Sequence, residues 1–310
     1  MFSRSRSRNL IAGLAGVMVS ALALGACAGD GATDGAGDAA GAGAGAGGER
    51  PERIVSLSPT ATESLFAIGA GDQVVAVDKF SYYPAEAPVV DGLDGHRPNV
   101  ESILSHDPDL VVVSTEDDSL MQGMEAADVP VLVLPAATDL DGAYSQIETL
   151  GAETGHVGDA AEVVKDMSAD IRAAVDSIPA ELRDAGLTYY HEVSSDHYSV
   201  TDATFLGAVY SEFGLSSIAT GDSDYPQLSA EAIVEADPDL IFLANATSES
   251  MTADDVAARP GWDQITAVRD GNITALDEDL ASRWGPRLPK FFESIAEALR
   301  GAQIPAAAGA

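Results

Sequence analysis

Two stretches of the chain, residues 100–111 and 230–241, repeat one another at a constant offset of 130 residues with no gap, and six of the twelve positions are identical. Repeats of solenoid proteins are much shorter, roughly 20–50 residues. A repeat at this spacing therefore indicates two related lobes. The length of 310 residues agrees with this, because a single hydrophobic core stops growing near about 250–300 residues.

Each copy of the repeat has the same local pattern. A polar residue, Asn99 or Ser229, is suited to cap a short helix, and a proline nine positions later ends it. An apolar run follows directly, at residues 110–113 or 240–243. Short aliphatic runs of this kind are typical of strands buried on both faces of a parallel sheet.

Apolar runs and helical patterns alternate along both halves of the chain. Further strand candidates are residues 54–57, 74–77, 131–134, 187–191 and 273–276. Residues 62–68 and 144–154 are examples of the helical stretches between them. The alternation predicts the α/β class, with two similar lobes that each contain a central parallel-type sheet.

One long helix is predicted between the halves, over residues 158–178, because apolar side chains recur there at helical spacing. At 1.5 Å per residue it is roughly 31 Å long, which is enough to run from lobe to lobe. Pro179 lies just beyond its end.

The N-terminus has the pattern of a secretory signal. Arg4, Arg6 and Arg8 precede an uncharged run, residues 10–24, which is shorter than the roughly 18 residues needed to span a bilayer. The run ends in Leu-Gly-Ala-Cys, which resembles the lipobox of bacterial lipoproteins and implies that Cys27 is lipidated. The alternative is an ordinary secretory signal with an incidental cysteine.

Composition narrows the classes of function. Residues 28–48 contain only Ala, Gly, Asp and Thr, and we expect a flexible tether with a reach of roughly 25 Å. A formal charge of −34 argues against nucleic acid and against charge-driven binding to an anionic membrane. The single cysteine excludes a disulfide framework. The predicted parts are residues 1–26 (signal peptide), 27–50 (lipidated cysteine and tether), 51–157 (N-terminal lobe), 158–179 (linking helix), 180–301 (C-terminal lobe) and 302–310 (flexible tail).

Several short motifs, in order and spacing, carry a family resemblance over about residues 51–300. They are Arg-Ile-Val-Ser-Leu-Ser-Pro at 53–59, Thr-Glu at 62–63, Gly69, Tyr-Tyr-Pro at 82–84, residues 99–103, Asp-Pro-Asp-Leu at 107–110, and residues 225–231. With the lipobox in front, the chain resembles the substrate-binding proteins of ABC importers for cobalamin and ferric siderophores.

The resemblance implies two lobes joined by one long helix, a ligand cleft between them, and no chemistry on the ligand. It also implies an ABC permease and its ATPase as partners, a small-molecule ligand, and a monomer at the outer face of the cell membrane, held only by its lipid anchor. In this family a glutamate on each lobe docks onto permease arginines, and the matching positions are Glu101 and Glu231. The alternative is that each carboxylate only complements its helix N-terminus, worth about 0.3–1 kcal/mol.

The ligand site is expected on loops at strand ends, where open α/β sheets bind ligands. Family members place aromatic residues at positions that match Phe80, Tyr83 and Tyr225, although packing in the core remains an alternative for each. The predicted ligand-binding residues are Phe80, Tyr82, Tyr83, His96, Arg97, His197, Tyr225, Arg283, Trp284 and Arg287.

Two arginines stand out in so acidic a chain. Arg283 and Arg287 are candidates for a fixed counter-charge to ligand carboxylate, phosphate or hydroxamate oxygens, and the alternative is surface salt bridges. Trp284 between them could stack on a ligand ring or cap the lobe. Trp262 is predicted to pack at a helix start.

Histidines are common metal ligands, but their spacing in this chain does not match a known metal-binding motif. His191-Glu192 and the nearby His197 lack the helical His-Glu-x-x-His pattern, and polar residues of a strand-end loop facing the cleft are favoured instead. His197 with Tyr198, or Tyr83, or His96, could ligate haem iron. We expect no resident cofactor and no metal site.

Four ligand and activity classes remain open. A corrinoid leads, a ferric siderophore follows with support from the arginines, and haem is third. A secreted metal-dependent hydrolase is the competing class, although the sequence carries no Gly-x-Ser-x-Gly elbow, P-loop or zinc-hydrolase motif.

Overall fold

The computed structural model describes residues 50–304. The predicted signal peptide, Cys27 and nearly all of the tether lie outside these residues, as does the predicted tail beyond Ile304. Among the described residues, no helix combines the length and the apolar character that crossing a membrane requires.

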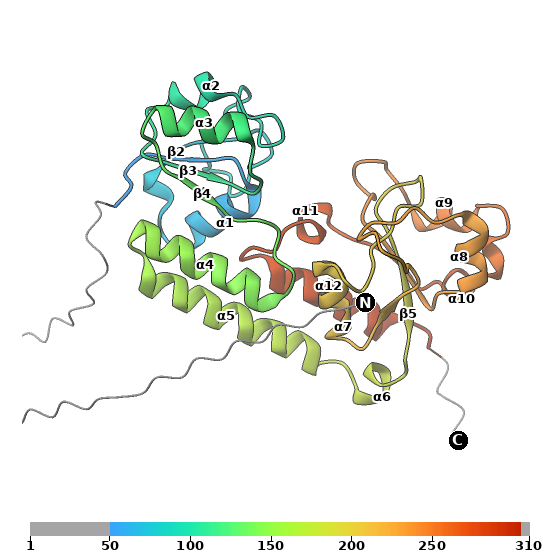
Figure 1. Cartoon of the computed structure of the whole chain (residues 1–310). Helices are drawn as coiled ribbons and strands as arrows, with labels where there is room; N and C mark the ends of the chain where they lie inside the picture. The colour runs from blue at the N-terminus through green and yellow to red at the C-terminus, as the bar shows by residue number, and fades with distance from the viewer. Residues whose placement is uncertain (1–49, 305–310) are drawn as a thin grey trace, which may run out of the picture. The chain divides into compact units, whose positions relative to one another are not determined.

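Two four-stranded parallel sheets form the framework of the fold (Figure 1). The first contains β1 (Ile54–Ser56), β2 (Val74–Val77), β3 (Leu110–Val113) and β4 (Val131–Val133), in the order β2-β1-β3-β4. The second contains β5 (Thr188–Glu192), β6 (Ser216–Ser217), β7 (Leu240–Leu243) and β8 (Ile273–Ala275), in the order β6-β5-β7-β8. Because the two orders correspond strand for strand, the prediction of two similar α/β lobes is confirmed. Both sheets lie in one compact unit of the chain.

Helices connect the strands of each sheet. Those of the first half are α1 (Pro59–Ala67), η1 (Gly71–Gln73), α2 (Val100–Leu104), α3 (Asp118–Ala126), α4 (Leu140–Thr154) and α5 (Val157–Asp176). Those of the second half are α6 (Ala180–Arg183), α7 (Phe205–Ser211), α8 (Ala230–Ala236), α9 (Ala253–Ala257), η2 (Trp262–Gln264), α10 (Thr266–Asp270), α11 (Glu278–Ala281) and α12 (Leu288–Gly301).

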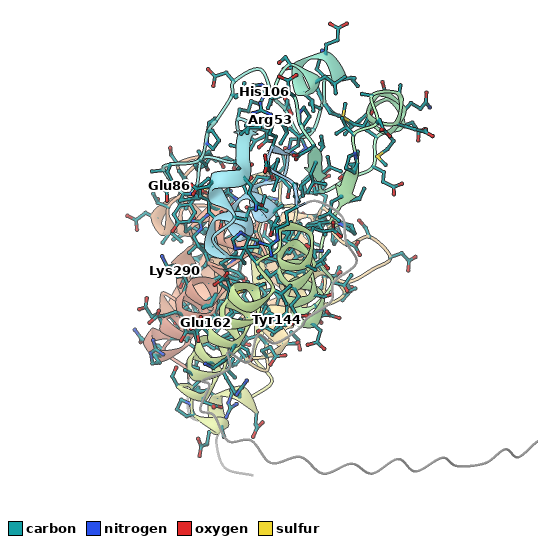
Figure 2. All side chains as sticks on the ribbon, turned by 90° about the vertical axis from the view of Figure 1, so that its left-hand side faces the viewer. Arg53, Glu86, His106, Tyr144, Glu162 and Lys290 are labelled. Carbon is teal, nitrogen blue, oxygen red and sulfur yellow. The ribbon has the colours of Figure 1, made fainter. Side chains whose placement is uncertain are left out.

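The structure explains why the two copies of the repeat share Asp-Pro-Asp. The backbone of the first aspartate is left-handed in both copies, with φ of 49° at Asp107, three residues after α2, and 45° at Asp237, the C-cap of α8. In the first lobe, the Arg53 guanidinium donates hydrogen bonds to the main-chain oxygens of His106 (2.5 Å) and Asp107 (2.8 Å), and Figure 2 labels Arg53 and His106 at this place. These contacts satisfy main-chain carbonyl groups of the turn that follows α2.

The second aspartate joins two neighbouring strands. The carboxylate of Asp109 accepts a hydrogen bond from the backbone N–H of Arg53 (2.9 Å), and that of Asp239 accepts one from Thr188 (2.8 Å). Each aspartate thereby ties the start of β3 or β7 to the start of β1 or β5. The second aspartate of the repeat therefore makes the same connection in both lobes.

The predicted helix caps are confirmed. Asn99 Oδ1 accepts a hydrogen bond from the backbone N–H of Ser102 (2.9 Å) at the start of α2, and Ser229 Oγ accepts one from Ala232 (3.1 Å) at the start of α8. β3 and β7 are buried at every position, as expected for central strands of parallel sheets.

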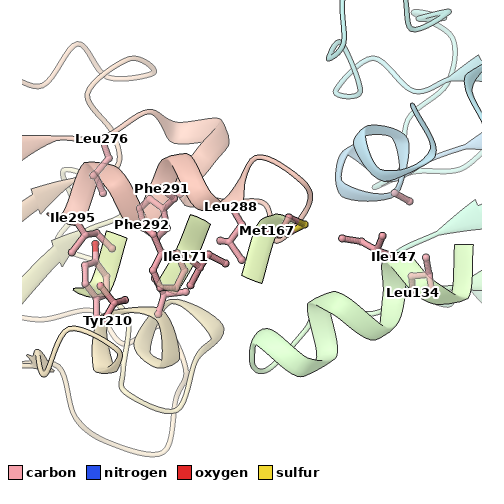
Figure 3. Close-up of a cluster of buried hydrophobic side chains, with 14 of the residues drawn as sticks. Leu134, Ile147, Met167, Ile171, Tyr210, Leu276, Leu288, Phe291, Phe292 and Ile295 are labelled. Atoms are coloured by element: carbon pink, nitrogen blue, oxygen red, sulfur yellow. The ribbon is translucent and has the colours of Figure 1, made fainter. Parts of the chain in front are cut away.

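The long helix between the halves packs against a second amphipathic helix. Met167 and Ile171 of α5 belong to the same buried cluster as Leu288, Phe291 and Phe292 of α12, and Figure 3 shows these side chains together. α5 runs over Val157–Asp176, where the sequence predicted a helix over residues 158–178. α12 therefore covers the linking helix with apolar surface.

Candidate ligand-binding site

Four tyrosines are the aromatic side chains that remain strongly exposed among residues 50–304. The exposed fractions are 53% for Tyr82, 40% for Tyr83, 41% for Tyr198 and 52% for Tyr225. All four lie on loops that follow strands, after β2, β5 or β6. In parallel sheets these carboxyl ends are where ligands bind. The tyrosines therefore mark an aromatic surface on the strand-end loops of both lobes.

A cavity of about 230 Å³ lies at the carboxyl end of the first sheet. Phe80 and His96, two of the predicted ligand-binding residues, both line it, with their rings edge to face at 5.2 Å. Asp78, Glu116 and Asp117 also line the cavity and give it an acidic wall. The predicted Arg97 is exposed and lies outside this lining.

A second cavity, of about 280 Å³, is assembled from four separate segments of the chain. They are residues 136–138, 203–206, 224–225 and 281–284. The cavity brings together three predicted residues, Tyr225, Arg283 and Trp284. Burial, followed by the nearby Asp224 carboxylate, raises the pKa of Tyr225.

Trp284 is held from two sides in this cavity. Its Nε1 donates a hydrogen bond to Gln146 Oε1 of α4 (2.9 Å), and its ring meets Phe205 at a centroid distance of 6.2 Å. The sequence left its role open between stacking on a ligand and capping the lobe. The structure gives it both a partner in α4 and a place in the cavity wall.

The two arginines of the loop between α11 and α12 are engaged in ion pairs with Glu63 of α1. Arg287 binds Glu63 through two hydrogen bonds of 2.6 and 2.8 Å, and Arg283 binds it through one of 2.8 Å. Arg283 also pairs with Asp279 at 2.8 Å. We call these four side chains the ionic quartet. Its Glu63 side chain is 2% exposed, so the pairing is internal, whereas the sequence alternative was a pair of surface salt bridges.

The rings of Tyr82 and Tyr83 make cation–π contacts with the two arginines of the ionic quartet. The Arg283 guanidinium lies 5.2 Å from the Tyr82 ring centroid, and the Arg287 guanidinium lies 4.1 Å from that of Tyr83. The Tyr82 hydroxyl donates a hydrogen bond to Asp279 Oδ1 (2.8 Å). Burial, followed by this hydrogen bond, raises the pKa of Tyr82, and the hydrogen bond with Glu63 raises that of Arg287.

The expectation that His191 and Glu192 face the cleft is wrong. Both are buried in β5, with at most 1% of their surface exposed. His191 Nδ1 is 2.9 Å from the Tyr210 hydroxyl, and burial lowers the pKa of the imidazole to about 4. Glu192 makes two hydrogen bonds, of 2.5 and 2.7 Å, with the guanidinium of Arg259. These residues stabilise the second lobe from inside.

His197 lies on the loop after β5, away from both cavities. Its backbone is left-handed, with φ of 64°, and its ring lies 5.7 Å from the ring of Trp262. Trp262 is 1% exposed, which confirms its predicted packing role, and the Arg259 guanidinium lies 4.5 Å from its ring centroid. Within residues 50–304, no group of three or more His, Cys, Asp or Glu side chains is placed to hold a metal ion.

The paired glutamates of the repeat occupy equivalent positions. Glu101 is the second residue of α2 and Glu231 the second residue of α8, and both side chains are exposed. Neither forms an ion pair with another described residue. Each carboxylate is therefore free to meet a partner while it also complements its helix N-terminus.

Three residues that contact the predicted site residues were missed from the sequence, and two of them are acidic. Glu63, Asp279 and Phe205 contact predicted residues but were not themselves predicted. The one signal for Glu63 was its place in the Thr-Glu motif at 62–63. A chain with 50 Asp and Glu residues offers no local sign of which carboxylate an arginine will meet.

Known proteins share this architecture. Residues 54–280 match the periplasmic binding protein family. The chain is 31% identical over 258 residues to the uncharacterized ABC transporter substrate-binding lipoprotein YvrC of Bacillus subtilis, covering 81% of each chain. It is 30% identical to a cobalamin-binding protein of Halobacterium salinarum, covering 82% of this chain and 71% of that one. The structure of the periplasmic heme-binding protein HutB of Vibrio cholerae superimposes with a TM-score of 0.71, at 22% identity over 80% of this chain and 98% of that one.

The repeated α/β lobes, the strand-end loops and these matches agree with one another. The sheet topology and the similarity to HutB establish the fold, and the match to residues 54–280 and the relatives of 30–31% identity establish the family. The chain belongs to the periplasmic binding protein family, the substrate-binding components of ABC importers.

Proposed function

We propose that this protein is a lipid-anchored receptor at the outer face of the cell membrane that captures a cobalamin-type ligand for an ABC permease and its ATPase. The observation that carries the proposal is the set of four exposed tyrosines on strand-end loops. Large aromatic surfaces in water are suited to contact a large, partly apolar ligand. The similarity to the cobalamin-binding protein of Halobacterium salinarum supports the same ligand class.

The charge of the site favours a corrinoid over an anionic ligand. Asp78, Glu116 and Asp117 line one cavity, and Asp224 lines the other. The two arginines proposed from the sequence as counter-charges are paired with carboxylates of the ionic quartet. An anionic ferric siderophore, or haem with its two propionates, would meet more negative than positive charge, whereas the amide side chains of a corrinoid would not be repelled.

Individual residues also support the two alternative ligands, a ferric siderophore and haem. Exposed Arg97, which forms no ion pair with another described residue, could receive a ferric siderophore. His96 beside Phe80, and the exposed Tyr83, are residue types that ligate haem iron. His197 with Tyr198 offers a second such pair. A secreted metal-dependent hydrolase remains the alternative from another class.

Docking to the permease is assigned to Glu101 and Glu231. Their equivalent positions on α2 and α8 suit a partner with two related basic pockets. Anchoring is assigned to Cys27, outside the described residues, through the lipobox-like sequence in front of it. In this proposal the protein is a monomer and alters no bond of its ligand.

Absorption spectroscopy of the full chain purified from its native host tests the ligand class. We expect corrinoid bands, and tight calorimetric binding of cyanocobalamin by the ligand-free protein with recovery of the ligand unchanged. Haem bands or ferric hydroxamate bands would replace the corrinoid by one of the alternatives. A colourless protein that binds none of cyanocobalamin, hemin and ferrichrome would contradict all three, and product formation would indicate an enzyme.

A further inference from the structure

We infer that Glu63 is a specificity-determining residue that occupies the arginine pair of the site and thereby disfavours anionic ligands. The inference deepens the proposed function and rests on the ligand site described there. The loop at residues 282–287 carries two arginines, yet both are paired with Glu63, and the 230 Å³ cavity is lined by three carboxylates with no Lys or Arg among the described residues of its lining.

The ionic quartet uses the hydrogen-bonding groups that an anionic ligand would need. Arg287 donates from Nε and Nη2 to the two oxygens of Glu63, at 2.8 and 2.6 Å. Arg283 donates from Nη1 to Glu63 Oε1 at 2.8 Å, and its Nη2 meets Asp279 at 2.8 Å and the main-chain oxygen of Phe80 at 3.2 Å. Two guanidinium groups and two carboxylates leave the quartet with no net charge.

Displacing Glu63 from this arrangement is costly. Its side chain is 2% exposed, while those of Arg283 and Arg287 are 9% and 15% exposed. A ligand carboxylate that took either arginine would leave Glu63 buried with fewer partners, and an uncompensated buried charge is strongly unfavourable. The bidentate geometry with Arg287 adds to the stability of the pair.

The quartet nevertheless borders the ligand site. Arg283 is part of the wall of the 280 Å³ cavity, next to Trp284. Tyr82 and Tyr83 lie over the two guanidinium groups and remain 53% and 40% exposed. The site therefore presents aromatic rings to the ligand and keeps its cationic groups paired behind them. Glu63 sets this charge pattern and does not need to touch the ligand.

A pair of probes that differ by one carboxylate tests the inference. The probes are cyanocobalamin and the monocarboxylate obtained by hydrolysis of one of its amides, titrated calorimetrically into the wild type and into Glu63→Gln. The wild type should prefer the neutral probe. The substitution removes one negative charge and leaves one arginine charge of the quartet uncompensated. The affinity for the monocarboxylate relative to that for cyanocobalamin should therefore rise about tenfold at low salt, and this rise should be smaller at high ionic strength.

Control variants distinguish an effect of the quartet's charge on ligand preference from a general effect on protein stability. Glu86→Gln removes an exposed carboxylate of the same lobe (labelled in Figure 2) that forms no ion pair with another described residue, and it should leave the ratio unchanged. Asp279→Asn, at a position where the side chain is 25% exposed, should shift the ratio in the same direction as Glu63→Gln and serves if the latter fails to fold. Glu63→Gln combined with Arg287→Gln restores neutrality and should return the ratio toward that of the wild type.

The outcomes distinguish the inference from the proposed function. Equal loss of affinity for both probes in Glu63→Gln and Asp279→Asn would assign the quartet a structural role only and overturn the inference. If the wild type binds neither probe, the proposed corrinoid ligand fails, and citrate then tests the inference alone. Citrate should raise the melting temperature of Glu63→Gln or Asp279→Asn more than that of the wild type and Glu86→Gln. The same shift in all four proteins would overturn the inference.

Discussion

The carboxylate of Glu192 and the guanidinium of Arg259 form a two-point ion pair, with hydrogen bonds of 2.5 and 2.7 Å, although 67 residues separate them in sequence. The Glu192 side chain is fully buried at the end of β5, and that of Arg259 is 16% exposed. The same guanidinium lies against the ring of Trp262, which in turn meets His197. The pair thus connects the second sheet to the loop that carries His197 and Tyr198.

Substitution of Arg259 by leucine should destabilise the protein by about 3–5 kcal/mol, because it leaves the buried Glu192 carboxylate without its charged partner, with only Asn245 Nδ2 still donating a hydrogen bond to it (3.0 Å). Urea unfolding at pH 7 measures the change. The double variant with Glu192→Gln should recover much of the loss, since the uncompensated charge is then gone. A single variant within 1 kcal/mol of the wild type would contradict this account of the pair.

Much of the fold could be predicted because its signals are local. The apolar runs at residues 110–113 and 240–243 became β3 and β7 without change of bounds, and the repeat around them encodes the same crossover twice. β6 was missed because it is two serines long, Ser216–Ser217, and is defined by pairing with β5 and not by an apolar pattern. The linking helix was predicted within two residues at its C-terminal end.

Less of the site could be predicted, because its contacts join distant parts of the chain. The position of the tyrosines on strand-end loops could be predicted, because a tyrosine that follows an apolar run is visible in the sequence. The partner of Arg287 was not, because Glu63 lies 224 residues away and is one of 50 acidic residues. His191 was misplaced because polar residues at a strand end were expected to face the cleft. The side chain is buried instead, with its Nδ1 2.9 Å from the Tyr210 hydroxyl, a contact that the sequence does not reveal.

Replacing both Glu101 and Glu231 by alanine should spare ligand binding and abolish uptake. Both side chains are exposed, so their loss removes no buried contact, and the permease would lose its two anionic contacts. Calorimetry measures binding, and radiolabelled ligand accumulation in cells measures uptake. Glu125→Ala with Glu235→Ala removes the same charge from exposed positions of the same lobes and should leave uptake intact. Normal transport by the Glu101/Glu231 variant would refute the docking assignment.

Acidification should destabilise the protein through His191. Burial holds the pKa of this imidazole at about 4 in the folded protein, against about 6.5 when unfolded. Between these values the unfolded chain binds the extra proton, so this contribution to stability falls as the pH drops from 7 toward 4. At pH 4.5 the loss due to His191 should reach about 2–3 kcal/mol.

The pH dependence of His191→Gln isolates this contribution. Its free energy of unfolding should fall less than that of the wild type between pH 7 and pH 4.5, because glutamine cannot take up a proton. The carboxylates titrate in both proteins and cancel in the comparison. His106→Gln, at a partly exposed position two residues beyond α2, removes a histidine from the other lobe and serves as the matched control. Parallel curves for the wild type and His191→Gln would show that the buried imidazole does not control acid stability.

Removal of the Tyr225 ring should weaken ligand binding without affecting folding. The side chain is 52% exposed and lines the 280 Å³ cavity beside Trp284, so it contributes contact area to a ligand and little to the core. Tyr225→Ser should raise the dissociation constant for cyanocobalamin about tenfold, which corresponds to the loss of one aromatic contact of roughly 1.4 kcal/mol. Tyr225→Phe keeps the ring and should bind nearly as well as the wild type. Unchanged melting temperatures with equal affinities for all three proteins would place the ligand elsewhere, because a ring at the contact surface cannot be removed without a measurable loss.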